Sequence, residues 1–416
     1  MIKYDIKSNY YGSIFLLIIA VLFAIFRNPN IFFFANVIIL IVTLLKCRLS
    51  FFSLKTIIVF YTLLPFFFKY NFNYVYGIFQ NTNSLYYLLI NLVLFLYLFF
   101  WLFIYFNTEI LNFEKEKYIN KIDIKKSHAV FFAAMAIIVT LIRFPSLPFL
   151  KEYNRFVSLL PGNGWNHVVM ILLAFSIPKL KESNFIKFAF LFVIVWFFGH
   201  YERVDCLGII CLLTIIFLSN VKLNFKKIFI TVITFIFLFF LLNVIESVRM
   251  GNSINLSNIF TKVLVQSTAS DVGYTFDRAI DYTKKNDLLY GSTYLKYIKE
   301  TVPMLEYKNS SINILNDEYY TVGGEFILNE PYMNFGILGI IVFSIIEFIY
   351  MYYLFKSKHI YSTFALYTLV FSVFRIVWYG ISYVETALIW YIPLILLFIK
   401  ILNKIKTKRG KVFGKS

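Results

Sequence analysis

The sequence has few of the residues on which soluble proteins and metal enzymes depend. Only 15% of its 416 residues are charged, and it contains three cysteines and four histidines. So small a charged fraction cannot cover the surface of a soluble protein of this length, which excludes a cytosolic globular enzyme and a disordered chain. The cysteines form neither a disulfide framework nor a metal motif. Without an HExxH or Walker-type loop, nothing supports a nucleotide-driven hydrolase, and we expect no cofactor.

Long apolar segments dominate what is present. Hydrophobic residues make up 60% of the chain, and its mean hydropathy is +0.74. A helix that spans a bilayer needs about 17–25 mainly apolar residues. Twelve segments approach this length, some only with their flanking residues: 11–26, 31–45, 51–68, 85–106, 129–142, 165–177, 185–199, 206–218, 228–245, 332–354, 361–377 and 384–401. We therefore predict an all-α polytopic integral membrane protein with about twelve transmembrane helices.

The positive charge of the chain predicts its orientation. The formal net charge is +18. With the N-terminus placed inside, 24 lysines and arginines fall on the cytoplasmic side and 7 in the short outer loops and helix ends. This asymmetry predicts that both termini are cytoplasmic. The basic excess then marks contact with anionic membrane lipids, and no nucleic-acid partner is expected.

One predicted outer loop is far longer than the others. It is polar, nearly neutral, and contains two amphipathic patterns separated by a turn at residues 290–291. The apolar positions are Val272, Phe276 and Ile280 in the first pattern, and Leu295, Ile298 and Val302 in the second. We therefore divide the chain into transmembrane helices 1–9 (1–246), an extracytoplasmic helical loop subdomain (247–331), transmembrane helices 10–12 (332–401) and a basic cytoplasmic tail (402–416).

The tight connection at residues 200–205 concentrates ionisable groups at the outer membrane edge. Two interpretations fit it. Arg203 can pair with Glu202 or Asp205 in a self-neutralising hairpin, or it can serve as a forked donor to a phosphate.

Ionisable residues elsewhere have similar structural alternatives. Arg278 can pair with Asp277 or Asp281 on the surface, and Arg375 can pair with Glu385 across the last outer turn. Glu347 lies within a predicted span without a local partner, which fits a structural hydrogen bond as well as a function.

Four short segments of the long loop resemble bacterial oligosaccharide repeat-unit polymerases, the O-antigen polymerase or Wzy-type family. They are residues 290–294 (YGSTY), 302–303 (VP), 323–325 (GGE) and 330–339 (EPYMNFGILG). Residues 199–203 (GHYER) are similar to the Gly-x-Arg element of that family, with a longer spacing, and the Arg-x10-Gly motifs of some relatives are absent.

The resemblance implies a multi-helix membrane glycosyltransferase of the bacterial cytoplasmic (inner) membrane with an extracytoplasmic active site. Such enzymes transfer a growing glycan from undecaprenyl diphosphate to the next lipid-linked repeat unit, building O-antigen, capsule or exopolysaccharide. The implied partners are these lipid-linked oligosaccharides, membrane lipids and a membrane protein that regulates chain length.

The resemblance also directs attention to the polar residues of the outer face. The candidates for the catalytic base are His200, Glu202 and Glu325, with Asp205 and Glu330 as further acids on this face. The candidates for binding diphosphate are Arg203, Arg249 and Arg278. The resemblance implies that Asn334, Phe335 and Gly336 shape the start of the helix that follows the long loop. No Asp-x-Asp cluster occurs, so we expect a metal-independent reaction in which arginine replaces a divalent ion.

Two other functions remain open. A related ligase, which transfers a finished glycan, would have the same helices and outer loop. A lipid-linked oligosaccharide flippase or other transporter would need polar residues through many spans and usually two related halves, whereas we find sparse mid-membrane charge and no repeat.

Overall fold

The computed structural model describes residues 124–148, 164–200, 202–218, 267–295, 310–321, 324–357 and 359–413, with single positions at 38, 58, 61, 62, 65, 96, 97, 160 and 244. Its α-helices are α6 (Lys126–Arg143), α7 (Gly164–Ser176), α8 (Asn184–Gly199), α9 (Arg203–Leu218), α12 (Ser267–Lys285), α14 (Ser311–Tyr319), α15 (Asn329–Lys356), α16 (Ile360–Tyr379), α17 (Ser382–Thr386) and α18 (Ile392–Phe413). Shorter turns are the 3-10 helices η2 (Ile177–Lys179) and η3 (Ser292–Tyr294) and the π-helical η4 (Ala387–Tyr391). Within the described ranges, no residue forms a β-strand.

The predicted membrane helices agree with the structure wherever it describes them. Four helices are long and apolar enough to cross a membrane: Lys126–Arg143, Asn329–Leu354, Ile360–Tyr379 and Val384–Ile401. The predicted segments 165–177, 185–199 and 206–218 are also helical, as α7, α8 and α9. The predicted segments 11–26, 31–45, 51–68, 85–106 and 228–245 lie, apart from single positions, outside the described residues, so the total of twelve stays a prediction.

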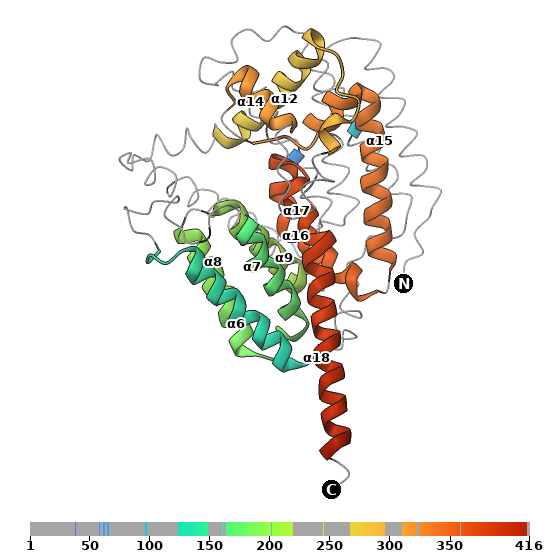
Figure 1. The fold of residues 1–416 in the computed structure, drawn as a ribbon. Coiled ribbons are helices and arrows are strands. Elements are labelled where there is room, and N and C mark those ends of the chain that lie inside the picture. The colour runs from blue at the N-terminus through green and yellow to red at the C-terminus, as the bar shows by residue number, and fades with distance from the viewer. Residues whose placement is uncertain are drawn as a thin grey trace.

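Helix α16 is the centre of the described structure (Figure 1). Its sequence is apolar on nearly all sides, as expected for a helix surrounded by protein. It packs against α7, α9, α15 and α18, and 16 of its side chains are buried. Residues at its end can therefore meet side chains from several distant parts of the sequence.

The contact between α9 and α16 depends on a glycine. A Cβ atom on Gly208 would lie only 1.9 Å from the carbonyl oxygen of Phe371 on α16. Any larger residue at position 208 must push the two helices apart. Because Asp205 lies one turn before Gly208, this close approach also sets how near the start of α9 comes to α16.

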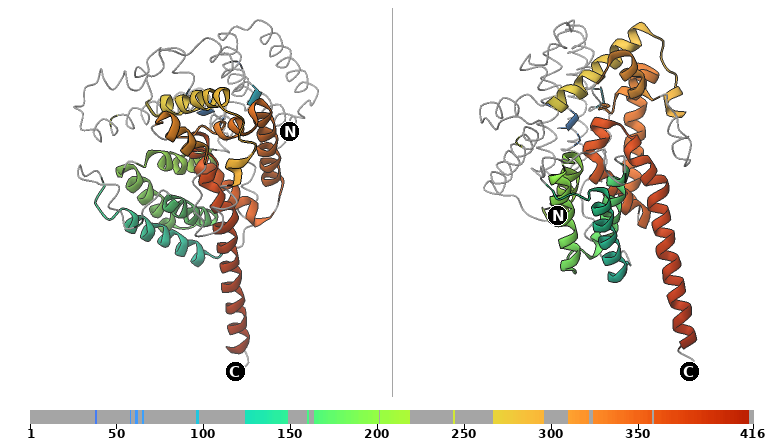
Figure 2. Two further views of the ribbon diagram at one scale, coloured as in Figure 1. Left: turned by 45° about the horizontal axis from the view of Figure 1, so that its top comes forward. Right: turned by 60° about the vertical axis from the view of Figure 1, so that its left-hand side comes forward.

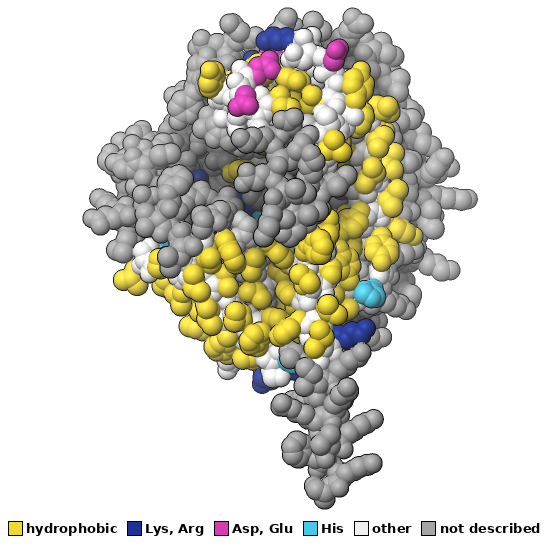
Figure 3. All heavy atoms as spheres, in the orientation of Figure 1, with side chains coloured by type: hydrophobic (Ala, Val, Ile, Leu, Met, Phe, Trp, Pro, Cys, Tyr) yellow, Lys and Arg dark blue, Asp and Glu magenta, His cyan; other side chains and the backbone are white. Residues whose placement is uncertain are grey.

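The described surface has a large apolar region and a polar end at the cap. Figure 3 shows hydrophobic side chains over most of the described surface between the ends, with acidic side chains gathered at the end formed by α12 and α14. Large apolar side chains are widely exposed, among them Phe188 (55%), Leu191 (60%) and Leu338 (65%). The C-terminal part of α18 extends from the opposite end (Figures 1 and 2). Such a surface fits a protein surrounded by lipid.

Helices α12 and α14, with η3, form a cap at one end of the molecule (Figure 2). The first amphipathic pattern is confirmed, because Val272, Phe276 and Ile280 of α12 are fully buried. Helix α14 was not predicted; the side chain of Ser310 caps its start by accepting a hydrogen bond from the Asn313 N–H (3.2 Å). The second predicted pattern lies beyond Leu295, outside the described residues.

Two of the C-terminal helices are less regular than predicted. Helix α15 begins at Asn329 and is broken at Gly336, whose φ of 60° and ψ of −142° are not helical. The predicted segment 384–401 is not one uniform helix, because π-helical turns separate α17 from α18. A π-turn has room for an extra residue, and here it exposes the Leu388 carbonyl to the Tyr361 hydroxyl, which donates to it at 3.0 Å.

Gly208→Ala should destabilise the bundle by about 1–3 kcal/mol, since overpacking a tight contact forces backbone shifts. The measurement is thermal unfolding of the detergent-purified protein, with Gly164→Ala as the control because a Cβ there meets nothing within 4 Å. Equal melting temperatures for both variants would contradict the close helix contact.

Candidate functional site

A buried ionic cluster occupies the cap-facing end of α16. The Arg375 guanidinium donates through Nε to Asp205 Oδ1 (2.5 Å) and through Nη2 to Asp205 Oδ2 (2.6 Å), a two-pronged pair. The same Nη2 lies 3.2 Å from Glu202 Oε2. All three residues are 5% exposed or less. Burial of an arginine in so apolar a protein requires such partners, because a lone charge would lose its hydration without compensation.

The cluster extends to helices α6 and α7 through an amide. Asn166 of α7 donates from Nδ2 to Asp205 Oδ2 (2.7 Å), and its Oδ1 accepts from Arg143 Nε of α6 (3.4 Å). Arg143 also donates to the Leu160 carbonyl. The two arginines balance the two carboxylates, so this buried group has no net charge. Helices α6, α7, α9 and α16 are thereby joined at one point.

The backbone around Glu202 explains why both Glu202 and Asp205 contact Arg375. The Glu202 N–H donates to the Phe197 carbonyl (2.9 Å) at the end of α8, and its own carbonyl accepts from the Cys206 N–H (3.1 Å). The turn between α8 and α9 is therefore short, and it holds Glu202 at the start of α9 close to Asp205. Negative side chains at this position are also stabilised by the positive end of the helix dipole.

These acids have a partner that the sequence did not suggest. The sequence suggests Arg203 for Glu202 or Asp205, and Glu385 for Arg375; the structure pairs Arg375 with both acids. Arg203 lies partly buried at the first position of α9. It is within electrostatic range of Tyr61, together with Arg375 and Tyr379. Arg249 lies outside the described residues.

Tyr61 packs on the same end of α16. Its ring stacks on Trp378 with centroids 4.1 Å apart, and its carbonyl accepts from the Trp378 indole N–H (3.1 Å). Because Arg203 and Arg375 share this neighbour, the structure brings the candidate anion binder close to the ionic cluster.

Glu325 reaches the end of α16 from the other side. Its N–H donates to the Trp378 carbonyl (2.8 Å), and residue 325 bridges to Tyr379. Its carboxylate is buried, accepts from the Ser311 hydroxyl, and fits over Gly380, where a Cβ would lie 2.9 Å from Oε2. The Tyr379 ring lies 5.7 Å from the Arg375 guanidinium. A continuous set of contacts therefore connects Glu325 with the ionic cluster.

The His200 side chain is buried and is not accessible to solvent. Its ring stacks on Phe144 (4.8 Å), its Nδ1 lies 2.8 Å from the Trp196 carbonyl, and its Nε2 lies 3.0 Å from the Ser146 carbonyl and 3.1 Å from the Ser146 hydroxyl. Burial lowers the pKa of His200 below its ordinary value of 6.5, although the backbone hydrogen bonds oppose this. These contacts fix the chain after α6 to the end of α8.

Asn334 joins two segments that carried the family resemblance. Its side chain accepts from the Gly291 N–H (2.8 Å) and donates to the Thr293 hydroxyl (2.7 Å) and the Glu330 carbonyl (2.8 Å). Its carbonyl accepts from the Tyr290 N–H (3.1 Å). The 290–294 turn is thereby bound to the first turns of α15.

The neighbours of Asn334 complete this junction. Phe335 stacks on Tyr294, with centroids 6.3 Å apart, and Gly336 breaks the helix immediately afterwards. Burial, followed by the Glu330 and Glu325 carboxylates, raises the pKa of Tyr294. The junction therefore also lies near the carboxylates of Glu330 and Glu325.

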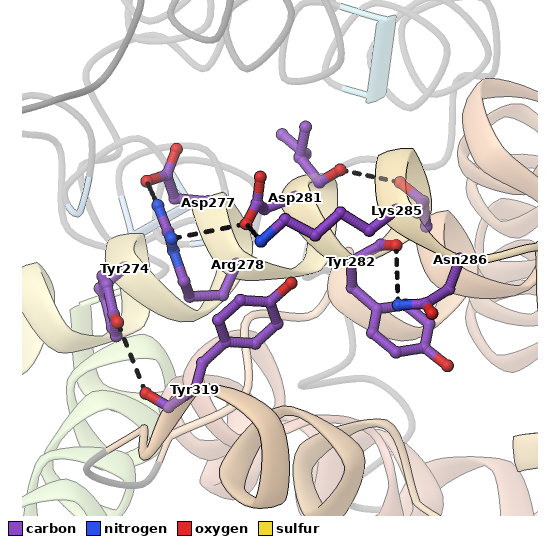
Figure 4. A network of polar contacts seen from close by, with 10 residues as sticks. Tyr274, Asp277, Arg278, Asp281, Tyr282, Lys285, Asn286 and Tyr319 are labelled. Carbon is purple, nitrogen blue, oxygen red and sulfur yellow. Dashed lines mark hydrogen bonds and ion pairs between the residues drawn. The ribbon is translucent and has the colours of Figure 1, made fainter.

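Arg278 lies on the cap with the expected acidic partners (Figure 4). Its Nη2 is 2.9 Å from Asp277 Oδ2, and its Nη1 is 3.6 Å from Asp281 Oδ2. Burial lowers the pKa of Arg278, but the two carboxylates outweigh burial and raise it.

Glu347 of α15 has a partner that the sequence could not identify, because the Tyr97 hydroxyl donates to its Oε2 at 2.9 Å.

Four residues of this site were missed by sequence reasoning: Arg143, Asn166, Tyr379 and Ser311. For Arg375, its partners Asp205 and Glu202 were not predicted. The available signal was the position of Arg143 and Arg375 at the ends of apolar segments, where ionisable residues need a partner. Among the described residues, no three His, Cys, Asp or Glu side chains are grouped so as to hold a metal ion.

Comparison with known proteins gives one match. The family model of the O-antigen polysaccharide polymerase Wzy matches residues 163–410, which include the ionic cluster from Asn166 to Arg375, the cap and the Asn334 junction. No curated protein and no solved structure matches the chain significantly.

Arg375→Gln should lower the free energy of unfolding by about 3–5 kcal/mol, because two carboxylates then stay buried without their cation. Adding Asp205→Asn and Glu202→Gln to this variant should restore much of the loss. Unfolding of the purified protein in mixed micelles measures both effects. Wild-type stability of Arg375→Gln, or a further loss in the triple variant, would contradict the arrangement.

The lowered pKa of His200 predicts a pH effect. Because the folded protein binds the proton less tightly than the unfolded chain, the stabilising contribution is present above pH 6.5 and is lost as the pH falls below it. Melting temperatures from pH 7.5 to 5 should therefore fall more steeply for the wild type than for His200→Gln. Melting temperatures that fall equally with pH in the wild type and in His200→Gln would refute this pH effect.

Proposed function

Because the chain belongs to the O-antigen polysaccharide polymerase Wzy family, we propose that it polymerises undecaprenyl-diphosphate-linked oligosaccharide repeat units at the outer face of the bacterial cytoplasmic membrane. The observation that carries this proposal is the arrangement at the end of α16. There Arg375 pairs with Asp205 and Glu202, and Glu325 is connected to this pair through Tyr379, at the end of α16 that faces the cap.

The proposed reaction is a glycosyl transfer. A hydroxyl oxygen of the acceptor sugar bonds to C1 of the growing glycan, while the bond from C1 to the diphosphate oxygen breaks. The acceptor proton passes to a base, and undecaprenyl diphosphate leaves with the electron pair. The protein must therefore place a base near the acceptor and positive charge near the departing diphosphate.

Arg203 is our preferred diphosphate ligand among the described candidates. It is the first residue of α9, where the positive end of the helix dipole favours an anion. Arg375 pairs with both neighbouring acids, Asp205 and Glu202. Arg249 remains a second candidate. Arg278 is a weaker one, since Asp277 and Asp281 already neutralise it.

Glu325 is our preferred base. Glu202 is engaged by Arg375, which makes its carboxylate a poorer proton acceptor, and both nitrogens of His200 face groups of the protein. Glu325 Oε1 accepts from the Ser311 hydroxyl, Oε2 lies at Gly380, and the contacts through Tyr379 connect this residue with the ionic cluster. In this scheme arginine provides the positive charge, so the reaction proceeds without a metal ion, and Asn334, Phe335 and Gly336 hold the entry to α15.

The excess of lysine and arginine on one side of the predicted topology supports an orientation. We place the cap outside and the C-terminal end of α18 in the cytoplasm. The membrane protein that would regulate chain length remains a proposed partner.

Arg203→Ala and Glu325→Gln should each abolish long-chain glycan while the protein still accumulates in the membrane. The assay is complementation of a deletion strain, with the surface glycan resolved as a ladder and Asp287→Asn as an exposed control. Normal ladders in both variants would exclude these assignments. In membranes, EDTA should leave polymerisation intact; rescue only by magnesium or manganese would exclude the metal-free scheme.

The deletion strain itself separates the alternatives. Loss of a polymerase leaves single repeat units attached to the acceptor. Loss of a ligase leaves full-length polymer on the lipid carrier, and this result would replace our proposal with the related ligase.

A further inference from the structure

The outward face of α12 and the end of α14 carry a group of polar and aromatic side chains that the proposed reaction does not use. We call it the cap network: Tyr274, Asp277, Arg278, Asp281, Lys285 and Tyr319 (Figure 4). The apolar face of α12 packs into the core, and Asp277 is the one member of the network that is fully buried with it.

The charges of the cap network neutralise one another. Arg278 pairs with Asp277 (2.9 Å) and Asp281 (3.6 Å), and Lys285 Nζ lies 2.8 Å from Asp281 Oδ2. Two cations and two carboxylates leave no net charge. A phosphate or another anion would have to compete with these carboxylates, so the network is poorly suited to the diphosphate.

The same cations hold two tyrosine rings in place. The Arg278 guanidinium carbon lies 5.2 Å from the ring centre of Tyr274 and 5.5 Å from that of Tyr319, and Lys285 Nζ lies 5.4 Å from the Tyr319 ring. The Tyr274 hydroxyl also approaches the Tyr319 carbonyl at 3.5 Å. Both rings stay partly exposed, as does the Arg278 side chain at 22%. The two rings and the Arg278 and Lys285 side chains are therefore reachable from solvent in part, whereas Asp277 Oδ1, Arg278 Nε and the Tyr319 hydroxyl are buried.

Ordered rings beside paired planar side chains match the chemistry of a sugar. The C–H face of a pyranose packs on an aromatic ring, and its neighbouring hydroxyls exchange hydrogen bonds with carboxylate and guanidinium groups. Because the ion pairs already fix these side chains, little entropy is lost when a ligand binds. A neutral site of this kind favours uncharged sugar units.

We propose that the cap network binds uncharged sugar units of the growing glycan, away from the bond that reacts. This inference rests on the proposed polymerase function. The cap lies at the same end of the molecule as the end of α16 (Figures 1 and 2). A glycan extending from that site into the outer medium passes the cap. Holding it there keeps the chain on the enzyme between transfers and lengthens the product.

The test compares Tyr319→Ala with Tyr319→Phe, which retains the ring, and with Asp281→Asn, in the complemented deletion strain. Weaker binding acts mainly through faster release of the glycan. Tyr319→Ala and Asp281→Asn should therefore reduce the most abundant glycan length in the ladder by about threefold or more, while the shortest polymers still form. Tyr319→Phe should keep the wild-type distribution. Asp287→Asn, exposed just beyond α12, serves as the matched control.

A binding measurement gives an independent readout. The probe is the strain's own polysaccharide, released from its lipid by mild acid and titrated into the detergent-purified protein by calorimetry. Tyr319→Ala should bind it about tenfold more weakly, equivalent to about 1.4 kcal/mol.

Wild-type ladders and binding in Tyr319→Ala and Asp281→Asn would overturn the cap network as a glycan site, as would equal shortening by Asp287→Asn. If Tyr319→Ala does not accumulate, Asp281→Asn decides. Failure of the wild-type gene to restore any ladder would instead overturn the polymerase assignment and leave the calorimetric test standing.

Discussion

Placing charge inside an apolar protein is the constraint on which the rest of this structure depends. Arg375 comes from a helix that is otherwise uncharged and mostly buried, and it is tolerated there because Asp205 and Glu202 pair with it. Those acids reach it only because Gly208 lets α9 approach the backbone of α16. Asn166 and Arg143 then bring α7 and α6 to the same point. Helix packing and the ionic cluster therefore require each other.

The cap is attached to the bundle through polar contacts at two places. Glu325 lies along the end of α16, and Asn334 binds the 290–294 turn to the start of α15. Both contacts involve buried groups that hydrogen-bond in one geometry, whereas apolar surfaces can slide on one another. The position of the cap relative to the ionic cluster is consequently well defined, as a site formed by loop and bundle together requires.

The sequence alone identified the helices with a periodic apolar pattern and the ion pairs between residues close together in one helix. Apolar segments located α6 to α9 and α15 to α18, and the spacing of Val272, Phe276 and Ile280 located α12. Pairs within one helix, such as Arg278 with Asp281, also follow from spacing alone. The partner of Arg375 could not be found in this way, because 170 residues separate it from Asp205 and only helix packing brings them together. The break at Gly336 and the short α14 are set by individual backbone and capping contacts, for which periodicity carries no information.

The separation between Asp205 and Arg375 has a consequence for synthesis. At roughly 5–20 residues per second, about 10–30 s pass between the appearance of the two residues at the ribosome. During that interval the acids at the start of α9 cannot yet be neutralised by α16, and the whole cap is made before their cation exists. The ionic cluster that joins α6, α7 and α9 to α16 can therefore form only after residue 375 has been added to the chain.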